Sequence, residues 1–210
     1  MADETIMRMQ ELIVMQPDGV VRLNFHGRLT VLGGLDAVER EQVVELLHRA
    51  MHGSVDHAEL RYTDSTGRRL LVRRSGGRRR VTILDDAGTS DATVPGPEDL
   101  PRITHVSNRD LGLAVDGGDA SIPQLVERLI GWLGRARNAG SRGTASLAVL
   151  SEPLVGISEN QMRDLLDAIE RLANMVQIVY LTSADVVTAW AGERAGAETV
   201  QLVESVAKLA

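Results

Sequence analysis

The chain has 210 residues, a net charge of −6, no cysteine and only 2% aromatic residues. The lack of cysteine excludes disulfides, thiolate catalysis and cysteine-ligated zinc. An apolar content of 43% and a charged content of 25% are typical of a globular domain with an aliphatic core. The N-terminus has no basic segment followed by an apolar run, and no apolar stretch approaches the about 18 residues of a membrane span. A cytoplasmic protein without a membrane partner is therefore expected.

Residues 1–86 predict strands, one helix and tight turns. Two short apolar runs flank Gln16-Pro17-Asp18-Gly19, whose turn chemistry predicts a hairpin. A β-rich run then enters a Gly-Gly turn, and an amphipathic helix that includes apolar Val38 leaves the turn and ends near Gly53. Three further runs, separated by glycine-containing turns, predict an antiparallel meander. The expected strands are 9–15, 20–25, 29–32, 56–63, 68–74 and 78–84.

The second half of the chain predicts parallel strands joined by helices. Residues 87–101 hold three prolines among small polar residues and are expected to link two lobes. Beyond them, short apolar runs alternate with helical periodicity, which favours right-handed crossovers. The expected strands are one or two within 103–115, then 146–150, 177–181 and, as a strand or helix start, 199–202, and the expected helices are 122–136, 158–175 and 184–192. We expect one composite α/β domain, with an N-terminal lobe 1–86, a linker 87–101 and a C-terminal lobe 102–210.

Seven arginines within thirteen residues, 68–80, give this segment of the predicted meander a charge of +7 in a chain whose net charge is −6. One interpretation is a solvated hairpin face that neutralises acidic neighbours. The other is contact with a nucleic-acid backbone, which the scarcity of aromatic residues would make sequence-tolerant. The candidate nucleic-acid-binding residues are Arg68, Arg73, Arg74, Arg78, Arg79 and Arg80.

The run RLTVLGGLDAVEREQVVELL, residues 28–47, resembles the strand, loop and helix of a phosphate-binding P-loop. With Gly34 as the first glycine of the G-x-x-x-x-G-K-[ST] pattern, Glu39 takes the place of the second glycine, Arg40 that of the lysine and Glu41 that of the Mg²⁺-binding hydroxyl. Gln42 follows in the same stretch. An ordinary strand-turn-helix unit is the alternative interpretation.

The order of the elements resembles the ATPase head of the SMC and ABC class of P-loop proteins. Residues 147–158, LAVLSEPLVGIS, are similar to the Walker B strand and the loop after it, and residues 177–185 are similar to the switch strand. The resemblance implies that Ser151 occupies the position of the Mg²⁺-binding aspartate, Glu152 that of the general base and Ser183 that of the switch histidine. Residues 115–119, with Gly117 and Gly118, resemble the signature loop, in which Asp116 replaces the serine.

Five positions of the resemblance lack the expected residue: Glu39, Arg40, Glu41, Ser151 and Ser183. Phosphoryl transfer needs metal, lysine and positioning groups together, so hydrolysis is not expected. The first hypothesis is a catalytically degenerate SMC/ABC-type head, a pseudo-ATPase without the coiled-coil arm. It would act as a scaffold or regulatory subunit, as a homodimer or with a related ATPase or another protein partner, in a DNA-associated complex. No cofactor is expected, because ATP and Mg²⁺ are disfavoured.

Two alternatives remain open. One is an atypical ATP-hydrolysing P-loop protein that uses Arg40 and Glu152, and the other is an accessory nucleic-acid-binding protein. His48 and His52 share one helix face but lack the glutamate of a zinc-protease helix, so no metal site is expected.

Overall fold

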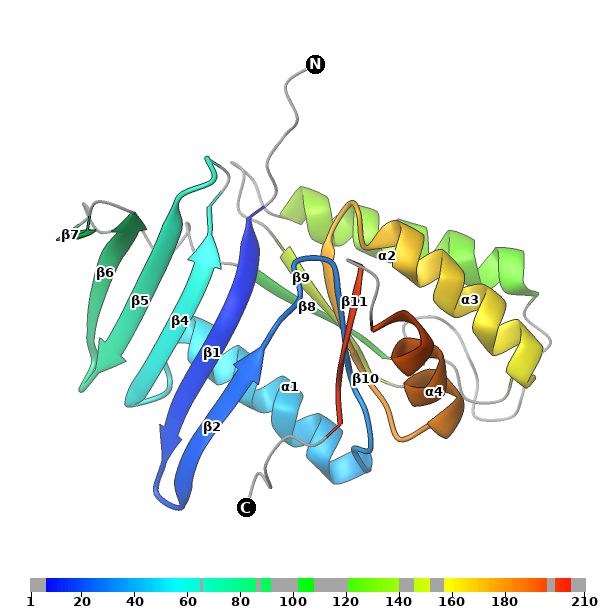
Figure 1. The fold of residues 1–210 in the computed structure, drawn as a ribbon, viewed down its shortest axis with the longest axis horizontal. Coiled ribbons are helices and arrows are strands. Elements are labelled where there is room, and N and C mark those ends of the chain that lie inside the picture. Colours follow the sequence, from blue (N-terminus) through cyan, green and yellow to red (C-terminus); the bar gives the residue numbers. More distant parts are fainter. Residues whose placement is uncertain are drawn as a thin grey trace.

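The fold contains two β-sheets and four helices in the described residues, which are 7–64, 66–85, 88–91, 102–107, 121–139, 146–151, 157–195 and 199–204 of a computed structural model. The layers follow one another as antiparallel sheet, helix, parallel sheet and helices (Figure 1). An α/β fold with an antiparallel N-terminal sheet and a parallel C-terminal sheet, as the sequence predicts, is confirmed.

The antiparallel sheet has six strands in the order β2-β1-β4-β5-β6-β7. The predicted hairpin and meander are confirmed, because neighbouring strands pair antiparallel throughout. The strands are β1 (Arg8–Gln16), β2 (Gly19–Asn24), β4 (His57–Thr63), β5 (Arg69–Ser75), β6 (Arg78–Asp85) and β7 (Gly88–Asp91). Strand β7 lies in the segment expected to be a linker. Its small polar residues carry no apolar signal, and it forms by backbone pairing with β6 at the sheet edge.

The parallel sheet has five strands in the order β11-β3-β10-β9-β8. Its strands are β3 (Leu29–Leu32), β8 (Arg102–Ser107), β9 (Ser146–Ser151), β10 (Gln177–Leu181) and β11 (Val200–Val203). The N-terminal strand β3 is inserted between β10 and β11, so the two halves of the chain build one sheet. The segment expected as a strand or helix start at 199–202 is thus a strand.

Four helices connect or cover these sheets: α1 (Ala37–His52), α2 (Ile122–Ala139), α3 (Glu159–Leu172) and α4 (Asp185–Arg194). Helix α3 begins with the predicted capping box, in which Ser158 and Gln161 satisfy each other's backbone N–H groups. Helix α1 ends at Gly53, whose φ of 82° is the left-handed conformation that glycine adopts most readily. None of the helices in the described part is both long and apolar enough to cross a bilayer.

Helix α1 lies between the two sheets, and its buried face joins them into one core (Figure 1). Val43 and Leu47 are fully buried there. Val38, expected on the apolar face, is 61% exposed because it lies in the first turn of α1. Helices α2, α3 and α4 cover the opposite face of the parallel sheet and form a second core with it.

Gln177 is a buried polar residue that ties the two sheets together. Its Oε1 accepts from Met9 N–H at 2.8 Å, and its Nε2 donates to Met9 C=O at 2.6 Å and to His26 C=O at 2.8 Å. The amide therefore satisfies backbone groups of β1 from the first residue of β10.

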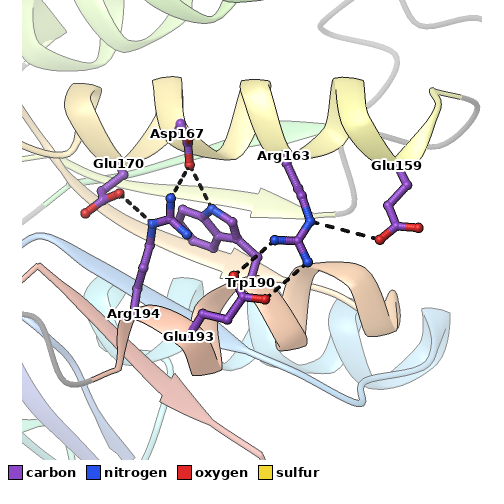
Figure 2. Close-up of polar contacts among 7 residues, drawn as sticks. All are labelled: Glu159, Arg163, Asp167, Glu170, Trp190, Glu193 and Arg194. Carbon is purple, nitrogen blue, oxygen red and sulfur yellow. Dashed lines mark hydrogen bonds and ion pairs between the residues drawn. The ribbon is translucent and has the colours of Figure 1, made fainter.

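A polar network holds α4 against α3 (Figure 2). Arg194 contacts Asp167 at 2.7 Å and Glu170 at 3.2 Å, while its guanidinium stacks on Trp190 at 4.6 Å. The Trp190 indole N–H also donates to Asp167. Because α4 follows directly after β10, this network fixes the segment beside the end of the central strand.

Candidate nucleotide site

The carboxyl ends of the parallel strands meet at one edge, the usual ligand-binding place in such sheets. Leu181 of β10 is in register with Leu32 of β3 on one side and with Ser151 of β9 on the other. The structure thus brings Ser151, Ser183 and the turn after β3 to the same edge. Ser183 is exposed and Ser151 is half-buried.

The turn between β3 and α1 consists of residues 33–36, and the backbone N–H groups of Gly33, Leu35 and Asp36 bond within the protein. Gly33 N–H donates to Val203 C=O, and Leu35 N–H donates to Thr182 C=O. Asp36 N–H donates to the Glu39 carboxylate at 2.8 Å. These are donors of the kind that would otherwise cradle a phosphate.

Asp36 caps α1 with its own carboxylate. Its Oδ1 accepts from Glu39 N–H at 2.8 Å, and the Glu39 side chain bonds back to Asp36 N–H, which completes a capping box. A helix N-terminus attracts anions because its N–H groups point outward and its dipole is positive there. In this protein two carboxylates of the chain itself occupy that position.

Helix α1 begins before the positions that align with the second glycine, the lysine and the hydroxyl residue of the P-loop pattern. Glu39 is its third residue, so Glu39, Arg40, Glu41 and Gln42 all lie within the helix. Arg40 directs Nη1 to Leu35 C=O at 2.8 Å, and Glu41 and Gln42 are exposed. The sequence aligned with a phosphate-binding loop therefore forms a short turn and a capped helix.

Two glycines shape the turn in different ways. Gly34 has a φ of +73°, and a Cβ built there would meet nothing within 4 Å. At Gly33 a Cβ would lie 2.3 Å from Cγ2 of Thr188 in α4. The close approach of α4 to the turn thus depends on Gly33.

Three residues of this edge were missed by the sequence reasoning. Asp36 could have been found from the D-x-x-E spacing of residues 36–39, which matches a capping box. Thr182 is fully buried and its hydroxyl accepts from Ala184 N–H, but no local pattern marks it. Thr188 meets Gly33 only through the tertiary fold. Glu152, Gly117 and Gly118, together with Asp116, lie outside the described residues.

The candidate arginines divide between the two faces of the antiparallel sheet. The register pairs Arg73 with Arg80 and Arg74 with Arg79, so these pairs lie on opposite faces. Arg74 is half-buried toward α1, where it donates to Met51 C=O at 2.8 Å. Arg68 bonds to Asp64 in the turn before β5. Arg74 and Arg79 therefore do not share a face with Arg73 and Arg80.

His26 and Asp64 are titratable groups with shifted pKa values outside the turn between β3 and α1. Burial, together with the nearby charges of Arg28 and Arg8, lowers the pKa of His26. For Asp64, burial acts to raise the pKa, but hydrogen bonds from Thr66 and Arg68 outweigh it and leave the pKa below its ordinary value. In the part of the chain that is described, no group of three or more potential ligand side chains is arranged to hold a metal ion.

No family model and no curated protein matches the sequence. Among solved structures, the chain resembles the SMC head domain from Thermotoga maritima, with a TM-score of 0.51 and 9% identity over 87% of this chain and 92% of that one. An ATP-binding cassette of an ABC transporter and a part of an ABC transporter complex also match at lower scores. MJ1267 in its ADP conformation has a TM-score of 0.39 and 11% identity over 88% and 84% of the two chains. CbiO1 from Clostridium perfringens has a TM-score of 0.37 and 15% identity over 90% and 82%.

The class of protein that the fold defines is an α/β domain similar in fold to the SMC head domain. At these identities the similarity concerns the fold alone.

Proposed function

We propose that this protein is a nucleotide-independent, ABC/SMC-type head that acts as a scaffold or regulatory subunit. The observation that carries the proposal is the capping box of Asp36 and Glu39 at the N-terminus of α1. In a P-loop the corresponding N–H groups receive phosphate oxygens. Here the chain supplies its own carboxylates, and the helix dipole is already complemented.

Electrostatics adds to this argument. A triphosphate placed at the turn would approach the Asp36 and Glu39 carboxylates. Two like charges about 4 Å apart repel each other by about 1 kcal/mol at the dielectric constant of water and by about 4 kcal/mol at that of a protein surface. Arg40 does not offset this with a lysine-like ammonium, because its guanidinium bonds to Leu35 C=O at 2.8 Å.

The partner surface we propose is the carboxyl edge of the parallel sheet with the first turn of α1. Val38, a large aliphatic residue, is 61% exposed there. We propose that a second copy of the chain packs on this edge, with a related ATPase subunit as the alternative partner. Nucleotide is not required to bring the copies together.

Calorimetric titration of the protein with ATP and Mg²⁺ tests the first part. We expect no binding in the micromolar range and no phosphate release above background. Micromolar affinity, with phosphate release that disappears in Glu152→Gln, would reject the proposal in favour of an atypical ATPase.

Sedimentation velocity over a range of protein concentrations tests the second part. We expect self-association that is unchanged by ATP and weakened by Val38→Glu. The matched control is Ile130→Glu, because Ile130 is also exposed, at 46%, but lies in α2. Helix α2 belongs to the helical layer on the other side of the parallel sheet from α1. A sample that stays monomeric at all concentrations would exclude the homodimer.

A further inference from the structure

One face of the antiparallel sheet packs on α1, and the other, here called the outer face, carries six arginines. Side chains alternate across a strand, so the register assigns each residue to a face. Leu12, Leu60 and Val72 point to the core and are at most 5% exposed. In Figure 1 the helices of the structure lie on the core side of this sheet. Among the side chains that the structure describes, the exposed arginines of the outer face are Arg22, Arg61, Arg69, Arg73, Arg78 and Arg80, and Glu11 and Glu59 are acidic residues beside them.

The outer face is strongly basic within an acidic chain. Six arginines and two glutamates give a charge of 6 − 2 = +4. The net charge of the chain is −6, so the rest carries −10. A local patch of opposite sign to the whole molecule attracts a polyanion while the remaining surface repels it.

The arginines come from separate strands, and three of them lie in one cross-strand row. Cross-strand neighbours run Arg22, Ile13, Glu59, Arg73 and Arg80 over β2, β1, β4, β5 and β6. At about 4.8 Å between strands, this row spans about 19 Å.

Both glutamates of the face are bridged to its arginines. Glu11 contacts Arg61 at 3.1 Å and Arg22 at 3.5 Å, and Glu59 contacts Arg73 at 2.8 Å. The arginine side chains nevertheless stay 46% to 62% exposed. Exposed ion pairs are weak, so phosphate oxygens can compete for these guanidinium groups.

The face offers charge without a stacking surface. Four of the five aromatic residues are buried in the cores, and the fifth, Trp132, lies in α2 on the other side of the molecule. Proteins that hold single strands use exposed aromatic rings for the bases. A duplex exposes its phosphates on the outside and needs no such rings.

We propose that the outer face binds the phosphate backbone of duplex nucleic acid without sequence preference. Residues from β2 and β4, namely Arg22 and Arg61, belong to this surface although they lie outside the arginine-rich segment of the sequence. Arg79, flanked by Arg78 and Arg80, does not belong to it, because it faces the core side. The surface is separate from the carboxyl edge of the parallel sheet, so the proposal does not depend on the nucleotide-independent scaffold.

Fluorescence anisotropy with a labelled 25-base-pair duplex of mixed sequence tests this. The outer face carries four net positive charges, so a plot of the logarithm of the affinity against the logarithm of the salt concentration is expected to have a slope of about −3 to −4. The affinity should therefore fall by about 100-fold between 50 and 200 mM salt. The variant Arg22→Gln/Arg78→Gln/Arg80→Gln is expected to bind at least 10-fold more weakly at 50 mM and to reduce the slope by about 2 to 3. Circular dichroism checks that each variant is folded.

Two control variants distinguish binding by the outer face from a general effect of positive charge. Arg79→Gln removes one charge from the same hairpin on its other face, and is expected to change the affinity less than twofold, whereas Arg78→Gln alone weakens it. Arg128→Gln/Arg135→Gln/Arg171→Gln removes three charges from α2 and α3 and is expected to leave binding unchanged.

The proposal is overturned if no duplex binding occurs at 50 mM salt, or if Arg79→Gln or the helix control weakens binding as much as the outer-face variants. It is also overturned if poly-glutamate or vesicles with phosphatidylserine bind more tightly than the duplex at equal salt, because the face would then serve an acidic protein or a membrane surface.

Discussion

Replacing Gln177 by methionine is expected to loosen the junction between the two sheets. Methionine has a similar length but offers no strong donor or acceptor. The change leaves Met9 N–H and Met9 C=O, at a residue only 1% exposed, without their side-chain partner. His26 C=O also loses its bond, but His26 is half-buried and can recover water.

The expected cost follows from these groups. A buried backbone group left without a partner costs about 1 to 3 kcal/mol, and the gain from burying an apolar side chain offsets part of the sum. We expect the free energy of unfolding to fall by about 2 to 4 kcal/mol. For a chain of this size, that lowers the Tm by about 5 to 15 °C.

Urea and thermal unfolding followed by circular dichroism measure the effect. The matched control is Gln201→Met, at a half-exposed position of edge strand β11, which is expected to cost less than about 1 kcal/mol. Gln177→Glu should be at least as destabilising at pH 7, because a carboxylate cannot donate to the two carbonyls. If Gln177→Met unfolds within about 1 kcal/mol of the wild type, the amide does not contribute as argued.

Three further perturbations test other parts of the structure. Asp36→Ala removes the cap of α1 and should reduce the free energy of unfolding, measured by urea titration, by about 1 kcal/mol. An unchanged free energy of unfolding would contradict the capping role. Gly33→Ala should cost about 1 to 3 kcal/mol by overpacking against Thr188 Cγ2, and Thr188→Ser, which removes that methyl group, should restore most of the loss in a double-mutant cycle. The pKa of His26 is lowered in the folded state, so above its unfolded pKa of about 6.5 the residue is neutral in both states and has no effect. As pH falls below about 6.5 the unfolded chain takes up the proton first, and stability should decline less steeply in His26→Asn than in the wild type.

Helix ends and hairpin turns were predictable because their causes are local. Ser158 with Gln161 and the glycine at 53 place the ends of α3 and α1 through hydrogen bonds and backbone conformation within a few residues. The same locality made the capping box of Asp36 and Glu39 readable from its spacing, although it was missed. Strand β7 has no such signal, since its stability comes from pairing with β6.

Apart from β7 and the choice between strand and helix at β11, the sequence by itself determined the order and type of the described elements, because periodicity, capping and turn residues act between near neighbours. Only the tertiary structure decided that Gln177 joins β1 to β10, that Thr188 closes on Gly33, and that Arg78 and Arg79 serve different faces. The first two depend on contacts between segments distant in sequence. The third depends on strand register, because a shift of one residue would reverse every side chain of a strand. That register is set by burying the apolar face of α1 and both faces of the parallel sheet at once, a condition that the whole chain meets together.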